Sequence, residues 1–202
     1  LSPDIHNSAI KFFNLDLSFE KWEMETNQLK EFFKTAHEKR IIGGCVTIPH
    51  KENVLEFFDD YDQSVKRIGS SNWFKVNKNK IIGFNTDYIG FEKCIPKSYK
   101  NNIDKKDCVV FGAGGSAKAV IEAFYGMKAK SITVINRSLE KAELISKKYK
   151  DIKINTFELG SDKAIKYIES SDLIVNTTSV GMSSGPNPKG NLNEGFNIKK
   201  NV

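Results

Sequence analysis

The sequence predicts an α/β protein with two α/β domains, and three observations support this fold class. After residue 107, strand-like and helix-like segments alternate strictly, which is typical of a parallel sheet covered by helices on both faces. The first hundred residues contain helices, separate strands and a hairpin in a less regular order. A polar, lysine-rich stretch over 96–107 separates the two halves. We therefore expect one domain over 1–100 and a second over 101–202.

Apolar periodicity and capping residues define the elements expected in the first half. Ser2 and Pro3 are typical N-cap and N1 residues, and apolar residues then recur at helical spacing. Pro49 ends a β-branched run because proline cannot donate to a ladder. The expected elements are a helix that begins at Ser2, a strand over 17–24, a helix that begins at Thr26, a strand over 46–48, a helix over 53–68, a hairpin of strands 73–76 and 81–84, and a helix from 87 through 94.

The second half alternates short apolar strands with helices. The strand-like runs are short, as expected for buried strands, and the segments that follow them have apolar residues at helical spacing. The expected strands cover 108–111, 131–135, 152–155 and 172–176, and the expected helices cover 116–127, 139–149 and 162–170.

The composition is that of an ordinary globular protein, with 39% hydrophobic and 28% charged residues in a chain of 202. This length can form one large domain or two small ones. No apolar run approaches the about eighteen residues that span a membrane, and no secretory signal opens the chain. Cys45, Cys94 and Cys108 lack the spacing of a metal site or a disulfide framework, which favours a reduced, cytoplasmic setting.

The net charge of +6 is unevenly distributed. Residues 1–100 carry 15 basic and 14 acidic residues, whereas residues 101–202 carry 16 basic and 11 acidic residues. The excess is scattered over predicted helix surfaces, without the interleaved aromatic residues that stack on bases. We therefore expect no nucleic-acid partner, and the basic second half favours an anionic cofactor.

A dinucleotide-binding fingerprint is predicted where a strand meets a helix, at Gly112-Ala113-Gly114-Gly115-Ser116-Ala117. Gly112 permits the tight turn, Gly114 lets the backbone approach the pyrophosphate, and Ala117 takes the close-packing third position. The helix N-terminus supplies N–H groups and partial positive charge to the phosphates. An ordinary glycine turn is the alternative, and the strand–helix context favours a Rossmann-type cofactor domain.

The end of the next strand predicts which dinucleotide binds. NAD-binding folds place an Asp or Glu there for the ribose 2′-hydroxyl, and this carboxylate would repel a 2′-phosphate. The chain has Asn136-Arg137-Ser138 instead, followed by Lys141. Arg137 can stack on adenine and pair with phosphate, and Lys141 adds a point charge. We expect NADP(H) rather than NAD, and the alternative interpretation is a solvated basic helix start.

The segment Gly43–Lys51 predicts a second site, in the first half. The predicted strand would hold Thr47 and Lys51 at its carboxyl end, where α/β proteins place their chemistry. A hydroxyl and an ammonium group held together suit a small polyhydroxylated or carboxylated substrate.

Several motifs occur together in one order along the chain. They are Leu1-Ser2-Pro3-Asp4-Ile5-His6-Asn7, Val46–Lys51, Asn72, and Asn85-Thr86-Asp87-Tyr88-Ile89-Gly90. With the glycine motif and Asn136-Arg137-Ser138, they resemble the shikimate dehydrogenase family across almost the whole chain. The resemblance implies the reversible, NADPH-dependent reduction of 3-dehydroshikimate to shikimate in aromatic amino-acid biosynthesis.

The resemblance also implies roles for individual residues. Lys51 and Asp87 would form the catalytic pair, and the substrate contacts would be Ser2, Thr47, Asn72 and Asp87. The segment Asn176–Met182 resembles the family's nicotinamide-side loop, in which Thr178 lies and Met182 would offer an apolar surface to the ring. From spacing alone, an ordinary glycine-containing loop is about as good an interpretation.

The chemistry of a ketone reduction agrees with the Lys51–Asp87 pair. Hydride addition leaves an alkoxide that must be protonated, so a general acid has to stand at that oxygen. Lys51 can donate this proton and stabilise the developing charge. Asp87 would hold the ammonium group and bind a neighbouring hydroxyl. The alternative is a surface ion pair worth ~0–1 kcal/mol.

Two residues depart from the family pattern: Cys45 stands where Asn is usual, and Trp73 where Thr is usual. We expect His6 and His50 to pack or cap rather than to catalyse. The family's first serine, its C-terminal glutamine and its last helix are not in this sequence, so we expect a fragment whose cofactor domain is incomplete.

The expected partners are a small-molecule substrate and no metal, membrane or nucleic acid, in a monomer or homodimer. Two other functions stay open on sequence alone. One is a quinate/shikimate dehydrogenase that uses NAD(P), and the other is a non-enzymatic ligand sensor of the same fold.

Overall fold

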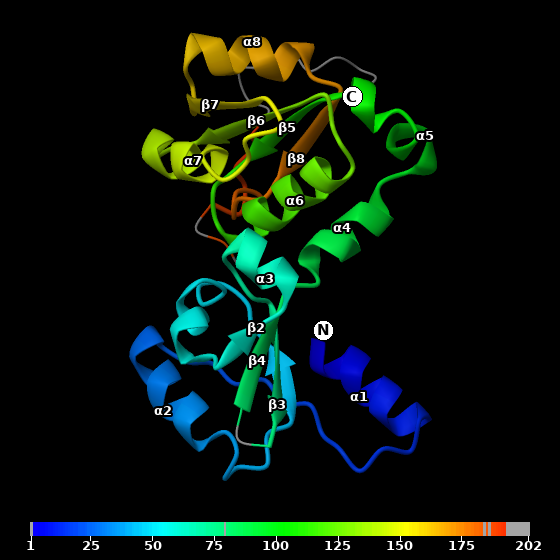
Figure 1. Ribbon diagram of the computed structural model, residues 1–202, viewed down its shortest axis with the longest axis vertical. Coiled ribbons are helices and arrows are strands. Elements are labelled where there is room, and N and C mark those ends of the chain that lie inside the picture. Colours follow the sequence, from blue (N-terminus) through cyan, green and yellow to red (C-terminus); the bar gives the residue numbers. More distant parts are fainter. Residues whose placement is uncertain (1, 79, 184, 186, 193–202) are drawn as a thin grey trace.

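The computed structural model in Figure 1 describes residues 2–78, 80–183, 185 and 187–192. Its strands form two separate four-stranded sheets, one in each half of the chain. Helix α4 (Asp87–Cys94) leads from the first sheet toward the second. The predicted α/β class with two α/β units is confirmed.

The first sheet is mixed, in the order β1 (Gly43–Cys45), β3 (Trp73–Asn77), β4 (Lys80–Phe84), β2 (Asp60–Tyr61). Strand β3 is antiparallel to β1 and β4, and β2 is parallel to β4. The predicted hairpin is therefore present as β3 and β4.

Aromatic side chains fill the core beside this sheet. Helix α2 (Leu29–Thr35), which follows the 3-10 turn η1 (Thr26–Gln28), contributes Phe33. The Phe33 ring meets those of Phe58 and Phe74 edge to face, with centroids 5.2 Å apart in both cases. Helix α1 (Ser2–Phe12) lies on the other side of the sheet from α2 (Figure 1).

The second sheet is entirely parallel, in the order β7 (Ile154–Glu158), β6 (Ser131–Asn136), β5 (Asp107–Phe111), β8 (Leu173–Asn176). Helices α6 (Gly115–Gly126) and α7 (Leu139–Ser146) cover one face, and α8 (Asp162–Ser170) covers the other. The predicted alternation of strands and helices is confirmed here, with α8 at the predicted bounds.

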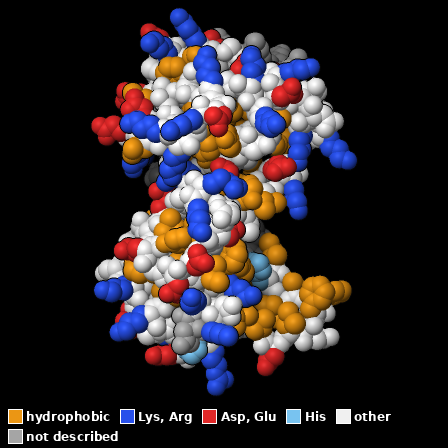
Figure 2. Space-filling model, in the orientation of Figure 1, with side chains coloured by type: hydrophobic (Ala, Val, Ile, Leu, Met, Phe, Trp, Pro, Cys, Tyr) orange, Lys and Arg blue, Asp and Glu red, His pale blue; other side chains and the backbone are white. Residues whose placement is uncertain are grey.

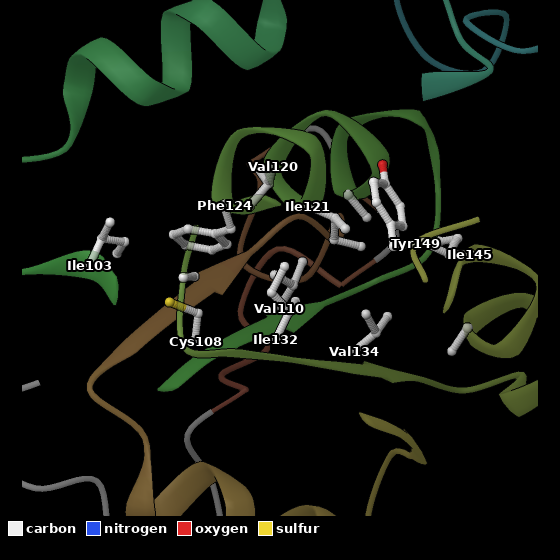
Figure 3. Close-up of a cluster of buried hydrophobic side chains, with 13 residues drawn as sticks. Ile103, Cys108, Val110, Val120, Ile121, Phe124, Ile132, Val134, Ile145 and Tyr149 are labelled. Atoms are coloured by element: carbon white, nitrogen blue, oxygen red, sulfur yellow. The ribbon is translucent and has the colours of Figure 1, made fainter. Parts of the chain in front are cut away.

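Side chains of β5 alternate between these two faces, as the pleat of a strand requires. Cys108 and Val110 pack with Ile121 and Phe124 of α6, and Figure 3 shows this cluster. Val109 and Phe111 of the same strand pack with Ala164 and Ile168 of α8. The strand is thus buried on both faces, which explains its continuous apolar sequence.

Short helices connect the two sheets. Helix α3 (Gln63–Ile68) contacts α6, and α4 packs along α6, with the rings of Phe91 and Phe124 edge to face at 5.3 Å. Helix α5 (Lys97–Lys100) and the 3-10 turn η3 (Ile103–Lys105) then lead into β5. Helix α6 therefore touches both halves of the molecule.

The predicted strand over 17–24 is wrong. In the described part of the chain this segment joins no sheet. The side chain of Asn7 instead bonds both backbone groups of Phe19, donating from Nδ2 to its carbonyl oxygen (2.9 Å) and accepting from its N–H (2.8 Å). An amide side chain thus occupies groups that a neighbouring strand would otherwise use.

The predicted helix over 53–68 is also wrong, because strand β2 interrupts it. The segment begins as a 3-10 turn, η2 (Asn53–Phe57), and Asp59 then bonds Ile81 of β4 with its N–H (2.9 Å) and with its carboxylate (2.7 Å). Asp62 caps α3 by accepting from the N–H of Val65 at 3.0 Å. Asp59 therefore follows the end of η2 and joins the sheet, and Asp62 begins α3.

The predicted strand over 46–48 is displaced, since β1 ends at Cys45. The N–H of Val46 still bonds the carbonyl oxygen of Asn72 at 2.8 Å, but residues from Thr47 onward turn away, with the N–H of His50 on the carbonyl oxygen of Thr47 at 2.9 Å. Thr47 and Lys51 therefore lie in the turn that follows the sheet.

Large apolar residues on α1 and directly after it are exposed, with relative exposures of 59% for Ile5, 79% for Phe12 and 66% for Phe13. Figure 2 shows a group of hydrophobic side chains over this helix. Among the described residues, no helix has the length and apolar character needed to cross a bilayer. The same residues contain no cluster of three or more potential metal ligands.

Ile121 tests the packing of α6 on its sheet. It is fully buried, so Ile121→Ala should destabilise the second half by about 2–5 kcal/mol, because the lost methyl groups leave a cavity. Thermal or urea unfolding followed by circular dichroism measures this. Leu144→Ala, at a site that is 62% exposed, is the control and should change stability by about 0.5 kcal/mol or less. Equal effects of the two variants would contradict the assigned packing.

Candidate active site

Lys51 and Asp87 form an ion pair between the two sheets. The Nζ of Lys51 lies 2.6 Å from Oδ2 of Asp87, and the two side chains are 15% and 29% exposed. Lys51 comes from the turn after β1, and Asp87 is the first residue of α4. The pair predicted from two distant motifs is thus in contact, and it is shielded more than a typical surface pair.

Asn72 holds the second oxygen of this carboxylate. Its Nδ2 donates to Oδ1 of Asp87 at 2.7 Å and to Oγ1 of Thr86 at 3.0 Å. Its own Oδ1 accepts from the N–H of Thr86 at 2.8 Å. Both oxygens of Asp87 are therefore bonded, one to a cation and one to an amide, which fixes the plane of the carboxylate.

Buried polar residues support the ion pair from the side of the first sheet, and the sequence motifs assigned no role to them. Asn85 is 2% exposed; its Oδ1 accepts from the N–H of Asp87 at 3.1 Å and its Nδ2 donates to the carbonyl oxygen of Ser70 at 2.9 Å. The N–H of Ser71 donates to the carbonyl oxygen of Lys51 at 2.7 Å. An asparagine or serine after a strand is usually a solvated turn residue, so residue type alone does not indicate burial. The one signal in the sequence was that these residues are neighbours of Asn72 and Asp87.

The predicted substrate contacts Ser2 and Thr47 are exposed. Neither side chain is hydrogen-bonded to another described residue, so both hydroxyls are free to meet a ligand. His50 and His6 hold structure, as expected: Nε2 of His50 lies 2.8 Å from the carbonyl oxygen of Met24, and the His6 ring stacks on Phe19 at 4.3 Å.

The glycine motif forms the turn between β5 and α6. Gly112 has φ +107°, and a Cβ there would lie 2.6 Å from Oγ1 of Thr177, so another residue would be strained and crowded. Ala113 and Ala117 pack against the core of the second sheet. A Cβ at Gly114 would meet nothing within 4 Å, and this N-cap has no side chain to occupy the first N–H groups of α6. The start of α6 can therefore receive a phosphate.

The same motif touches the ion pair. A Cβ at Gly115 would lie 3.2 Å from Cβ of Lys51, and Nζ of Lys51 donates to Oγ of Ser116 at 3.4 Å. The predicted cofactor loop and the predicted catalytic lysine are thus neighbours, although they belong to different sheets.

The order of the strands in the second sheet reverses at this point. The chain runs outward from β5 to β6 and β7, then returns to β8 on the other side of β5. Ligands of open parallel sheets bind at the carboxyl ends of the strands where the order reverses. The glycine motif follows β5, so it lies at this switch point.

A cationic region follows β6. Asn136 donates from Nδ2 to the carbonyl oxygen of Ser138 at 2.9 Å, which shapes the turn into α7. Arg137 and Lys141 are exposed, and neither has an acidic partner among the described residues. Two free cations at this position suit a ribose 2′-phosphate.

The loop after β8 is held by its own polar groups. Oδ1 of Asn176 accepts from the N–H of Thr178 at 2.8 Å and from its hydroxyl at 2.7 Å, and Nδ2 of Asn176 donates to the carbonyl oxygen of Val180 at 3.1 Å. Met182 is 44% exposed beyond this turn. Because β8 is adjacent to β5, this loop borders the glycine motif.

Cys45 stands near the ion pair. Its Sγ lies 3.8 Å from Nε2 of His6, and Trp73 is its cross-strand partner. Burial raises the pKa of the Cys45 thiol, and the negative charge of Asp87 raises it further. The two departures from the family pattern therefore lie together beside the site.

Comparison with known proteins shows two matching family models. The model described as the shikimate dehydrogenase substrate binding domain matches residues 1–74, and the model described as shikimate / quinate 5-dehydrogenase matches residues 95–183.

Curated relatives agree with the family models. The shikimate dehydrogenase (NADP(+)) of Caldicellulosiruptor bescii is 39% identical over 90% of this chain and 62% of its own length. That of Clostridium botulinum is 36% identical over 93% of this chain and 69% of its own length. The chain thus spans about two thirds of these proteins.

Solved structures have the same fold. Shikimate dehydrogenase from Aquifex aeolicus superposes with a TM-score of 0.80 at 33% identity, covering 92% of this chain and 67% of that one. The Thermus thermophilus shikimate 5-dehydrogenase, in complex with NADP(H) and shikimate, superposes with a TM-score of 0.70 at 26% identity, covering 93% of this chain and 68% of that one.

Alkylation of Cys45 tests the geometry of the site without a turnover assay. Because the thiolate is the nucleophile and its pKa is raised above the usual 9.0, labelling by iodoacetamide should still accelerate above that pH. Asp87→Asn removes one cause of the shift and should move the rate profile to lower pH, as followed by mass spectrometry of the Cys45 peptide. Glu92→Gln, on the same helix, should leave the profile unchanged. An identical profile in Asp87→Asn would contradict the placement of Cys45 beside Asp87.

Proposed function

This chain belongs to the shikimate dehydrogenase family, and we propose that it carries the site for the reversible, NADPH-dependent reduction of 3-dehydroshikimate to shikimate. The observation that carries this proposal is the Lys51–Asp87 ion pair beside the glycine motif. The reduction of a carbonyl group by hydride needs two things: an acid at the carbonyl oxygen, and a dinucleotide-binding site next to that acid.

Lys51 is the proposed proton donor. As the carbonyl carbon accepts hydride, negative charge develops on its oxygen, and an ammonium group at that oxygen both stabilises the charge and delivers the proton. Asp87 keeps Nζ of Lys51 in place and accepts from a hydroxyl of the substrate. Asn72 fixes the carboxylate, and the exposed hydroxyls of Ser2 and Thr47 complete the proposed contacts to the ring.

The described residues fit NADPH, which supplies the hydride when bound. Proposed contacts to the pyrophosphate are the N–H groups at the start of α6, reached through Gly112-Ala113-Gly114-Gly115-Ser116-Ala117. Arg137 and Lys141, with the turn of Asn136 and Ser138, would hold the 2′-phosphate. Thr178 and Met182 would border the nicotinamide. The absence of a carboxylate at the end of β6 supports NADP(H) over NAD.

Substrate binding and cofactor binding are assigned to different halves of the chain. We assign substrate binding to residues 1–100 and cofactor binding to residues 101–202, and the support for this assignment is the separation of the strands into two sheets. The three free cysteines support the cytoplasm as the working compartment. A monomer or a homodimer remains our expectation for the assembly.

Loss of NADPH absorbance in the presence of 3-dehydroshikimate tests the activity on the full-length protein. In the oxidative direction, shikimate and quinate should be compared, because the second family model covers dehydrogenases of both. A higher kcat/KM for quinate would reassign the substrate. Ligand binding without any turnover would indicate a sensor of the same fold.

Lys51→Met should lower kcat by about 10²- to 10⁴-fold, since no other group replaces the proton donor. KM should change little, because the carboxylate and hydroxyl contacts to the substrate remain. Steady-state kinetics of the full-length enzyme measure both constants. Lys66→Met, at an exposed lysine of α3, is the matched control and should behave as the wild type. Near-normal turnover in Lys51→Met would refute the assignment.

Arg137→Ala should reduce kcat/KM for NADPH by about 10- to 100-fold, the loss expected for a charged hydrogen bond of about 1.5–3 kcal/mol. The kcat/KM for NADH should stay nearly constant, because NADH has no 2′-phosphate to lose. Lys147→Ala, at the exposed C-cap of α7, controls for the change in net charge. A wild-type enzyme with the higher kcat/KM for NADH would overturn the cofactor assignment.

A further inference from the structure

One face of α6 carries polar contacts to the first half of the molecule. Gly115, Lys118 and Glu122 are spaced by three and four residues, so they form a stripe along one side of the helix. Figure 1 shows α3 and α4 lying against α6. The stripe meets its partners at three successive levels of the helix.

At the first level the backbones are nearly in contact. A Cβ at Gly115 would lie 3.2 Å from Cβ of Lys51 and 3.4 Å from Cβ of Ser70. The hydroxyl of Ser70 donates to the carbonyl oxygen of Gly115 at 3.4 Å. Glycine at this position lets the turn that holds Lys51 approach the start of α6.

At the second level, Nζ of Lys118 lies 2.6 Å from Oε2 of Glu52. The Lys118 side chain is 16% exposed and that of Glu52 is 44% exposed, so the pair is shielded on the α6 side and open to solvent on the other. Glu52 directly follows Lys51 in the chain. Two adjacent residues therefore reach the second half of the molecule, one through Ser116 and one through Lys118.

At the third level, Glu122 is buried, with a side chain 5% exposed. Its carboxylate accepts from Nε of Arg67 at 2.5 Å and from the hydroxyl of Tyr149 at 3.1 Å. A buried carboxylate is costly unless a cation and hydrogen bonds compensate it. Arg67, from α3 in the first half, is the one cation in contact with Glu122 among the described residues, and the pair raises the pKa of Arg67.

The charges of the stripe define its register. Along α6 the cation Lys118 comes before the anion Glu122. On the first half, the anion Glu52 faces Lys118 and the cation Arg67 faces Glu122. A slide of one helical turn, about 5.4 Å, would bring Lys118 toward Arg67 and leave Glu122 without its cation. Opposite charges in this order therefore select one alignment of the two halves.

We propose that Lys118 and Glu122, with Glu52 and Arg67, are positioning residues that set the alignment of Lys51 against the cofactor site. The proposal rests on the proposed function, in which the proton donor belongs to one half and the hydride donor binds to the other. A misplacement of about 1 Å between reacting groups costs on the order of 10²-fold in rate. None of these four side chains needs to touch substrate to control that distance.

Charge reversal on the full-length enzyme tests the Lys118–Glu52 level. Lys118→Glu and Glu52→Lys should each lower kcat by about 10-fold or more, with KM for both ligands within about three-fold, because each binding site lies within its own half. The double variant restores the pair and should recover kcat to within about three-fold of the wild type. Lys128→Glu, at an exposed residue beyond the end of α6, makes the same charge change away from the interface and should be neutral.

Arg67→Gln tests the third level, away from the start of α6. It should lower kcat with both KM values retained, and Arg67→Lys should recover part of the loss. All rates are expressed per folded site, counted by binding of NADPH, so that loss of folded protein is separated from misalignment. Losses confined to KM for NADPH, or a double variant no better than the single variants, would overturn the proposal.

Hydrogen–deuterium exchange distinguishes failure of the alignment proposal from failure of the proposed function. The single charge reversals should speed exchange in the first turns of α6 and in the segment after Lys51, and the double variant should reverse the change. A wild type that does not oxidise NADPH refutes the function, and with it the kinetic role of the stripe. Unchanged exchange in the single variants of an active enzyme refutes the alignment alone.

Discussion

The carboxylate of Asp87 is the constraint on which both halves of the site depend. One oxygen accepts from the ammonium group of Lys51 and the other accepts from the amide of Asn72. The carboxylate therefore cannot rotate without breaking one of these two partly buried hydrogen bonds. Asp87 is also the first residue of α4, whose far side packs on α6. The group that orients the proposed proton donor therefore begins the helix that joins the two sheets, and the position of one is tied to the position of the other.

Local signals predicted the order of strands and helices in the described part of the second half, although β7 lies later than the predicted strand over 152–155 and α7 ends before residue 149. Strand β5, the glycine motif and α6 follow one another within twenty residues, and each is determined by side chains that are neighbours in sequence. The first half was harder because its elements depend on distant partners. Phe19 bonds Asn7 instead of a strand, and Asp59 bonds Ile81 of β4, which splits a segment with clear helical spacing. Apolar periodicity reports which side chains can be buried together, and it does not report which backbone groups find a partner.

The site shows the same division. Lys51, Asp87 and Asn72 were predicted from motifs, and the structure brings them within hydrogen-bond distance, while their roles in turnover remain predictions. Asn85 was part of a motif but received no role, because nothing in the sequence distinguishes a buried asparagine from one in a solvated turn. Glu122 was hidden for a related reason: a glutamate on a helix is usually exposed, and only the arrival of Arg67 from α3 permits its burial.

The stripe on α6 also limits how this architecture can be recombined. The cation-then-anion order on α6 is matched by an anion-then-cation order contributed by the turn after Lys51 and by α3. The proposed alignment predicts that a chimera of this first half with the cofactor half of another relative assembles best when the new helix carries the same order of charges. On the role proposed for the stripe, a helix graft between family members would have to transfer the two ion pairs as a set, together with the apolar contacts that surround them.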